Sequence, residues 1–295
     1  MASRPHPRVN RAAPRRRRAR RFTFKSVRRL IRLWWRAFRK TVAAHPPAVR
    51  FLVSAVIILL VWGAVNWVYQ TVNKPTEVFF PLDDTLDKSL PETWRQYGPL
   101  FREHSTAVIT PDLLAAIAQV EGGGNPVART YWRWRLTWNP LELYQPASSA
   151  VGMYQITDAA FHEAKRYCIH DHVVVEDGPW YDMGSCWFNS LYTRVVPSHA
   201  IELTSVLLDR GVASAMRHRR IVPATLQRKQ DLAAVIHLCG IAAGHAFAAR
   251  GFQLPPHERC GDHDVRTYLA RVNGMKHQFA RMASDGTVTR LAGPH

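Results

Sequence analysis

Acidic residues are absent from the first 50 positions of this 295-residue chain, which hold 17 Lys and Arg. The whole chain carries 40 basic and 22 acidic residues, so the other 245 positions hold 40 − 17 = 23 bases against 22 acids. The basicity therefore belongs to one arm, residues 1–50. The rest of the chain lacks the basic surface that nucleic-acid binding requires. The run RRRRARR is not accompanied by a folded nucleic-acid-binding domain. We expect no nucleic-acid partner.

Charged residues are also absent from positions 51–68, FLVSAVIILLVWGAVNWV. As a helix rising ~1.5 Å per residue, this stretch is roughly 27 Å long, close to the hydrocarbon thickness of a bilayer. The basic arm predicts that the N-terminus stays in the cytoplasm. A cleaved signal peptide would have a shorter arm and small residues after the apolar run, where Trp67 and Tyr69 stand. We expect an uncleaved single-pass anchor, residues 51–69, with three aromatic residues near the outer interface: Trp62, Trp67 and Tyr69.

The basic arm contains one stretch with apolar residues, SVRRLIRLWWRAFRK at 26–40. Leu, Ile, Trp and Phe alternate there with six Arg and Lys, a pattern typical of a basic amphipathic helix lying on anionic lipids of the inner leaflet. The alternative is a disordered arm that only sets the topology of the anchor.

Cysteine is scarce, and all four cysteines follow the apolar run. None lies in the paired C-x-x-C spacing of a structural zinc site, which argues against metal binding by CIHDH (168–172) and HERCGDH (257–263). On an oxidising side of the membrane, two disulfides are the default. Four cysteines allow three pairings, and we favour the two that close short loops, Cys168–Cys186 and Cys239–Cys260. We expect no metal.

Alternating, strand-like runs are few after residue 90, and no internal repeat is present. Residues 70–90 mix Pro, Asp and Lys without periodicity and are predicted to be a linker. Residues 91–285 are predicted to form one mostly α-helical domain, followed by a tail at 286–295. The helices are expected at 91–104, 110–121, 156–168, 198–211, 230–249 and 263–283.

The stretch AQVEGGGNP places one carboxylate, Glu121, where an apolar helix must end. Thr110 and Pro111 start this helix as N-cap and first residue. At the C-terminal end, the helix dipole and the apolar turn both disfavour a carboxylate anion. A carboxyl that keeps its proton near neutral pH can act as a general acid, and the glycines leave its flank open. The alternative is an ordinary helix end whose glutamate faces solvent.

Three blocks resemble the lytic transglycosylase domain of the goose-type lysozyme fold: EGGGNPVA (121–128), ASSAVGMYQIT (147–157) and RTYLARV (266–272). That family reads E-S-x-x-N-P-x-A, then S-x-x-A-x-G-x-M-Q, then T-x-x-Y-V-x-x-V. The matching residues are Glu121, Asn125, Pro126, Ala128, Ser148 or Ser149, Ala150, Gly152, Gln155 and Tyr268, with Met153 shifted by one.

The resemblance implies a predominantly helical, lysozyme-like fold of the α+β superfamily, following the single-pass anchor. It implies cleavage of the β-1,4 bond between N-acetylmuramic acid and N-acetylglucosamine in peptidoglycan, with no cofactor. Glu121 would protonate the leaving oxygen, and the 2-acetamido group of the substrate would stabilise the cationic carbon. Glu121 would then take the proton of the 6-hydroxyl, which closes a 1,6-anhydro ring. The location implied is a bacterial inner membrane with a periplasmic catalytic domain, near peptidoglycan strands and possible envelope protein partners.

The same resemblance assigns roles around Glu121. Gln155 and Ser148 or Ser149 would hold the sugar amide or the glutamate itself, and Gly152 and Met153 belong to the same substrate-binding block. Tyr268 would donate a hydrogen bond to Glu121. The alternative is structural, with Gly152 permitting tight packing and Tyr268 filling the core.

The chain departs from the family pattern in three places. Gly122 replaces the serine that follows the glutamate. The A-Y-N-A-G block is best matched by GIAAG (240–244), with Ile241 for the tyrosine and Ala242 for the asparagine, which puts substrate contacts there in doubt. The connection between the first two blocks is lengthened by YWRWRLTWNPLELYQP (131–146).

The added segment 131–146 is rich in aromatic residues with two arginines between them. Its aromatic faces could stack on sugars and its arginines could meet acidic stem peptides, with Trp132, Trp134 and Tyr144 as candidate substrate-binding residues. The alternative is a loop packed down by its own tryptophans. A second carboxylate would have to be Glu142, Asp158 or Glu163.

Three functions are therefore compared. The first is a membrane-anchored lytic transglycosylase. The second is a hydrolytic muramidase of the same fold, which normally needs a second carboxylate. The third is a glycan-binding scaffold without activity, which the loss of the A-Y-N-A-G block favours and the retained Glu121 opposes.

Overall fold

The computed structural model describes residues 32–33, 35–36, 39–82, 84–179, 181–182, 184–217 and 224–291. The chain forms two compact units, Met1–Ala64 and Val65–His295. It is mostly helical, with 61% of residues in helices and 9% in strands, as expected. Most of the predicted amphipathic helix at 26–40, and the RRRRARR run, lie outside the described residues.

Helix α2 (Pro47–Asn73) contains the predicted anchor and extends beyond it at both ends. Its most apolar 18-residue window has a mean hydropathy of 2.4 and no buried residue, so α2 is long and apolar enough to cross a membrane. It is the one such helix among the residues that the structure describes. Two of its side chains are buried, Asn66 and Gln70, and both belong to the second unit.

Residues 70–90 differ from the linker expected of them. They hold the end of α2 and two short 3-10 helices, η1 (Pro75–Leu82) and η2 (Asp84–Leu86). Glu77 within η1 is completely buried. The segment therefore packs as part of the second unit.

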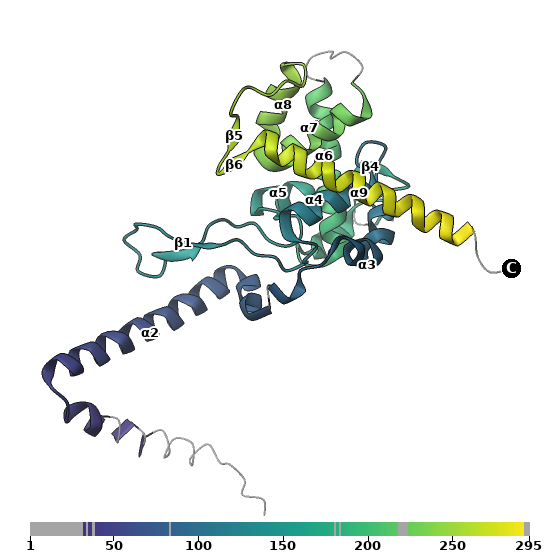
Figure 1. Cartoon of the computed structure of the whole chain (residues 1–295). Coiled ribbons are helices and arrows are strands. Elements are labelled where there is room, and N and C mark those ends of the chain that lie inside the picture. Colours follow the sequence, from purple (N-terminus) through teal and green to yellow (C-terminus); the bar gives the residue numbers. More distant parts are fainter. Residues whose placement is uncertain are drawn as a thin grey trace, which may run out of the picture. The chain divides into compact units, whose positions relative to one another are not determined.

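The core of the second unit is built from long helices (Figure 1). Helix α4 lies along α9, and α3 packs against both. Helix α7 packs against α9, and α6 packs against α7 and α8. The helices are α3 (Leu90–Glu103), α4 (Pro111–Gly122), α5 (Asp158–Ala164), α6 (Pro197–Arg217), α7 (Leu226–Cys239), α8 (Ile241–Ala249) and α9 (Val265–Leu291).

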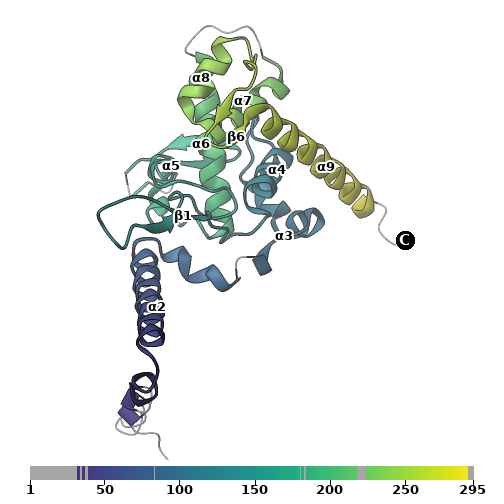
Figure 2. The ribbon, with the colours of Figure 1, turned by 60° about the vertical axis from the view of Figure 1, so that its left-hand side comes forward.

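Three small antiparallel hairpins complete the second unit (Figure 2). Their strands are β1 (Trp132–Trp134) with β2 (Tyr144–Pro146), β3 (Tyr167–His170) with β4 (Val173–Glu176), and β5 (Arg259–Cys260) with β6 (His263–Asp264). Both predicted disulfides are confirmed, with Cα–Cα distances of 5.5 Å for Cys168–Cys186 and 5.4 Å for Cys239–Cys260. Within the described ranges no group of His, Cys, Asp and Glu has the arrangement of a metal site.

Local signals explain where the two helices around the site begin. Ser89 and Glu92 form a capping box at the start of α3, in which the Ser89 N–H donates to Glu92 Oε2 at 2.9 Å. Helix α4 starts at Pro111 after the N-cap Thr110, as expected. It ends at Gly123, which has φ +56° and so needs the conformational freedom of glycine.

Glycine misled the prediction of two helices. Helix α6 was expected to stop at Gly211 but continues to Arg217, because Gly211 allows Ile236 of α7 to pack closely: a Cβ there would lie 3.2 Å from Ile236 methyl carbons. The single helix expected at 230–249 is instead broken at Gly240, where φ is +81°. Helix α9 also runs beyond 283 to Leu291, into the predicted tail.

Candidate active site

Glu121 lies in the last turn of α4, as the sequence predicted. Its side chain is 17% accessible, so it is neither in bulk solvent nor sealed in the core. The preceding turns of α4 anchor it, since Leu113, Leu114 and Ile117 are all buried. The position therefore combines a rigid apolar support with a partly open carboxyl.

Two other helices bring polar groups to Glu121. The Tyr268 hydroxyl of α9 donates to Glu121 Oε1 at 2.6 Å, which is the hydrogen bond expected from the resemblance. Burial, and then the neighbouring Glu121 carboxylate, raise the pKa of Tyr268 well above its usual value, so it remains a donor. His237 of α7 places Nε2 3.6 Å from the same oxygen.

The two oxygens of Glu121 differ in their surroundings. Tyr268 and His237 both face Oε1, while no described residue donates a hydrogen bond to Oε2. The carboxyl is thus held in one orientation through one oxygen. A general acid needs an oxygen that is free to transfer a proton, and Oε2 meets this requirement among the described residues.

Packing explains the replacement of the family serine by Gly122. A Cβ at Gly122 would lie 2.8 Å from Met153 Cα and 3.1 Å from Ala128 Cβ. The end of α4 therefore lies directly on the backbone of the second block. Any side chain at this position would push the two blocks apart.

The turn after Glu121 is held by Asn125, which is completely buried. Its Oδ1 accepts the Val127 N–H at 3.0 Å, and its Nδ2 donates to Asp87 Oδ1 at 3.1 Å. Gly124 has φ +67°, and a Cβ there would collide with the Thr93 hydroxyl. The asparagine and the glycines of this block therefore shape the turn that exposes Glu121.

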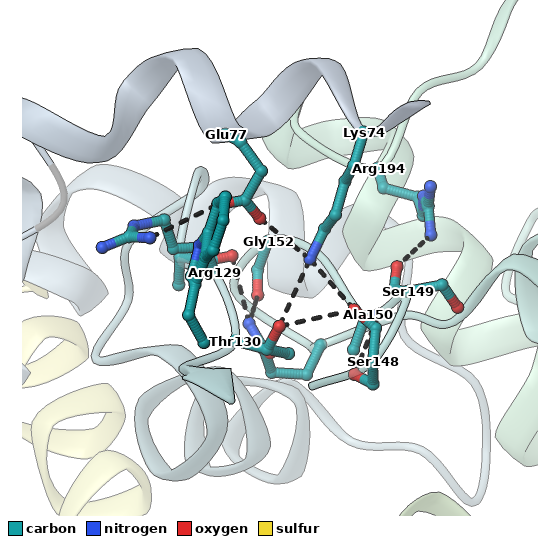
Figure 3. Close-up of polar contacts among 12 residues, drawn as sticks. Lys74, Glu77, Arg129, Thr130, Ser148, Ser149, Ala150, Gly152 and Arg194 are labelled. Atoms are coloured by element: carbon teal, nitrogen blue, oxygen red, sulfur yellow. Dashed lines mark hydrogen bonds and ion pairs between the residues drawn. The ribbon is translucent and has the colours of Figure 1, made fainter. Parts of the chain in front are cut away.

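The polar residues of the second block also bond mainly to their own loop (Figure 3). Ser148 Oγ accepts the Ala150 N–H at 3.1 Å, and Ser149 Oγ accepts the Asp158 N–H at 3.2 Å. The Gln155 amide donates to the carbonyls of Ala128 and Gly152 at 3.1 and 2.9 Å. These three side chains position the loop, and no hydrogen bond joins any of them to Glu121 in the described part of the chain.

Two further residues of the second block have packing roles. Gly152 has φ +80°, and a Cβ there would collide with the Arg194 carbonyl oxygen. Met153 is fully buried beneath Gly122. Both therefore support the loop from inside, which agrees with the structural alternative for Gly152.

A cavity of about 460 Å³ lies beside the acid, between α5, α6, α7 and the start of α8. His237, which contacts Glu121, lines it together with Gln155 and Ile241. Glu121 itself is not among the lining residues, so His237 connects the acid to this space. Two arginines, Arg210 and Arg217, also line the cavity and make it favourable for a ligand with an anionic group.

Of the candidate second carboxylates, one lines this cavity. Glu163 of α5 is exposed on the cavity wall. Asp158 forms an ion pair with Arg194 at 2.8 Å, and Glu142 accepts from Asn139 at 2.9 Å. Glu163 is therefore the one of the three whose position is compatible with a role next to a bound ligand.

The aromatic segment lies away from this cavity. Trp132 and Trp134 are in β1, paired with Tyr144 in β2, and none of these three lines the cavity. Trp132 donates its indole N–H to Glu77 at 2.8 Å, while Trp134 is 70% exposed. The structure therefore does not bring the predicted sugar-stacking residues to the cavity beside Glu121.

Sequence reasoning missed His237. The signal was available, because AAVIHLC places a lone histidine in an apolar run near a helix end, as AQVEG does for Glu121. Arg210 and Arg217 carried no comparable signal, since both lie on an ordinary amphipathic helix. Their meeting at one cavity depends on how α6 and α7 pack.

No protein-family model, curated protein or solved structure matches this chain. Arguments about its function therefore depend on the residues and geometry described above.

Proposed function

We propose that the chain is a membrane-anchored enzyme that cleaves peptidoglycan glycan strands by lytic transglycosylation. The observation that carries the proposal is the hydrogen bond from Tyr268 to Glu121. The two residues are 147 positions apart, and the resemblance in sequence pairs the same two residues. A lysozyme-like arrangement of the helices, a bacterial inner membrane and a periplasmic catalytic domain are parts of the same proposal.

The geometry supports a one-carboxyl mechanism. Tyr268 and His237 hold Oε1, so the proton of the Glu121 carboxyl resides on Oε2 and passes to the glycosidic oxygen as the C–O bond breaks. The 2-acetamido oxygen of the substrate attacks the cationic carbon and holds it. Glu121, now a carboxylate, removes the proton of the 6-hydroxyl, whose oxygen displaces the acetamido group and closes the anhydro ring. The acid ends protonated again, now with the proton of the 6-hydroxyl, and no water is consumed.

Hydrolysis by the same fold is the second candidate, and the position of Glu163 favours it. Inverting glycosidases use a second carboxylate to activate water, and Glu163 lines the cavity next to His237. In this reaction Glu121 would protonate the same leaving oxygen, and the product would carry a reducing end.

Product analysis tests both candidates. The full chain in detergent is incubated with purified peptidoglycan sacculi, and the released fragments are weighed by mass spectrometry. We expect anhydro products, which are lighter than hydrolytic products by one water, and a loss of rate of about 10²–10⁴-fold in Glu121→Gln. Reducing-end products that disappear in Glu163→Gln would select the hydrolase. Binding of sacculi without turnover would select the inactive scaffold, which Ile241 in the cavity wall is compatible with.

A further inference from the structure

The hairpin β1–β2 with its connecting loop, residues 131–146, exposes large apolar side chains. Leu136 and Trp138 are fully exposed, and Trp134 is 70% exposed. Arg133 and Arg135 alternate with them and are exposed as well. Contiguous apolar side chains rimmed by charge mark a surface that contacts a partner or a membrane.

The hairpin is fastened to the last two turns of α2 (Figures 1 and 2). The Asn66 amide donates to the Tyr144 carbonyl at 2.8 Å, and the Gln70 amide donates to the Leu141 carbonyl at 2.7 Å. Residues 66 and 70 are one turn apart, so they share one face of the helix. This face is buried under the hairpin, while Val65, Val68 and Val72 on the rest of the helix surface are exposed.

The depth of Asn66 places the hairpin relative to lipid. Asn66 lies inside the uncharged run 51–68, two residues before its end. An amide at this level meets little water and needs a protein partner, and the partner is the Tyr144 carbonyl. Trp134 stands opposite Tyr144 in the β-ladder, with ring centroids 4.8 Å apart. The exposed face of the hairpin is therefore at the level where the apolar part of α2 ends.

The base of the hairpin is fixed by the Glu77 cluster, which consists of Lys74, Glu77, Arg129 and Trp132. Figure 3 shows the first three of these residues. Arg129 Nη1 and Trp132 Nε1 donate to Glu77 Oε2 at 3.3 and 2.8 Å, and Lys74 Nζ lies 3.2 Å from Oε1. Burial lowers the pKa of Lys74, and the adjacent Glu77 charge opposes that shift. Because this cluster joins the hairpin to the residues that follow α2, the hairpin cannot swing away from the helix end.

We infer that the hairpin 131–146 is a second membrane-contacting element, separate from the α2 anchor. Trp134, Leu136 and Trp138 insert into the interfacial layer of the leaflet at the C-terminal end of α2. Arg133 and Arg135 extend to the phosphates of the lipid headgroups, because long basic side chains beside interfacial aromatics place their charge in the polar layer. The domain is thereby seated on the membrane and not tethered to it by a free linker.

Lipid fits the hairpin better than a glycan does. A glycan-binding platform would be expected to continue into the cavity beside Glu121, yet no residue of the hairpin lines that cavity. The aliphatic Leu136 is fully exposed at the loop and offers nothing to a sugar face, whereas it suits an acyl chain.

A spin label at position 136 tests the inference in the full chain. All four native cysteines are in disulfides, so Leu136→Cys provides the one thiol to label. The matched control is Leu226→Cys, also an exposed leucine, at the start of α7 and outside the hairpin. Both labelled proteins are reconstituted in vesicles of phosphatidylglycerol and phosphatidylcholine, and the collision of each label with oxygen and with a water-soluble nickel chelate is measured.

We expect the label at 136 to shift towards oxygen collisions and away from the nickel chelate, while the label at 226 remains water-exposed. Equal nickel accessibility at both positions would overturn the inference. A second measurement adds soluble glycan strands to the vesicles. If the label at 136 is water-exposed in vesicles and is immobilised by glycan, the hairpin binds substrate and not lipid. The readout requires no turnover, so it is independent of whether the proposed enzymatic function holds.

Discussion

Two regions of the second unit each hold a glutamate away from bulk water, and the two glutamates differ in how their carboxylate oxygens are paired. In the Glu77 cluster, two cations and an indole N–H surround both carboxylate oxygens. At the end of α4, Tyr268 and His237 share one oxygen of Glu121 and leave the other without a donor among the described residues. Burial alone therefore does not mark a reactive acid. Glu77 has a cation beside each oxygen, whereas the described neighbours of Glu121, Tyr268 and His237, both face Oε1.

A third buried glutamate resembles Glu77 and strengthens this contrast. Glu202 of α6 accepts the Ile169 N–H at 2.8 Å on one oxygen and the Tyr192 hydroxyl at 2.7 Å on the other. Burial, and then the hydrogen bond to Glu202, raise the pKa of Tyr192 well above its usual value. Glu202 thus joins α6 to β3 and to the loop before α6, and it has no oxygen left for a ligand.

The largest expected effect on stability comes from replacing the glutamate of each region by glutamine. In Glu77→Gln, the buried ion pair between Lys74 and Glu77 is broken and Arg129 loses its contact with Glu77 Oε2. Removing one partner of a buried ion pair costs about 3–5 kcal/mol. For a unit of this size, Tm should fall by roughly 6–20 °C. In Glu121→Gln the amide keeps an acceptor for Tyr268, so we expect little change in Tm. Thermal unfolding of both variants in detergent, followed by near-ultraviolet circular dichroism, measures the difference.

The turnover of sacculi by the same two variants completes this comparison. Glu77→Gln should retain activity below its Tm, while Glu121→Gln should lose it. A Glu121→Gln protein that unfolds as easily as Glu77→Gln would contradict the distinction drawn between the two acids.

The difference between the two regions also explains what the sequence could predict. The position of Glu121 at a helix end could be predicted because its signal is local: one carboxyl closes an apolar helix and glycines follow. The hydrogen bond from Tyr268 to Glu121 could be predicted from the order of the motifs. The two disulfides could be predicted from the short loops that they close. Glu77 carried no such signal, since Arg129 and Trp132 lie 52 and 55 positions away. A segment that looks aperiodic was therefore expected to be a linker, although distant partners hold it in place.

The same limit applies to glycine and to the aromatic segment. Gly211 and Gly240 look alike in sequence, and only the contact with Ile236 makes the first a packing site within a helix. The tryptophans of 131–146 were expected either to bind sugars or to pack as a loop. In the structure the two tryptophans differ. Trp132 donates a hydrogen bond to Glu77, whereas Trp134 remains exposed beside the end of α2.

A smaller effect is expected from placing at Gly122 the serine of the lytic transglycosylase pattern that the sequence resembles. The new Cβ would lie 2.8 Å from the Met153 backbone, so Gly122→Ser should destabilise the protein by about 1–3 kcal/mol through overpacking. The control is Gly274→Ser, which is also helical but has no atom within 4 Å of the added Cβ. Chemical denaturation of both variants gives the two free energies of unfolding. A Gly122→Ser protein as stable as the control would show that the two blocks can separate without cost.

The smallest effect concerns the hydroxyl that orients Glu121. Tyr268→Phe should lose about 1 kcal/mol of stability near neutral pH, the typical contribution of one hydrogen bond. Burial and Glu121 raise the pKa of Tyr268 in the folded state, while a tyrosine of the unfolded chain titrates near pH ~10. Above that pH the unfolded state binds fewer protons than the folded state, so the stability that Tyr268 contributes declines as pH rises.

The phenylalanine variant lacks this titration. The other buried tyrosines are present in both proteins, so their contributions cancel in the difference between the two unfolding free energies. The difference in unfolding free energy between wild type and Tyr268→Phe should therefore narrow as the pH is raised from about 8 to about 11. Denaturant titrations across that range measure it. A difference that stays constant would mean that Tyr268 titrates alike in the folded and unfolded chains, which would contradict its burial beside Glu121.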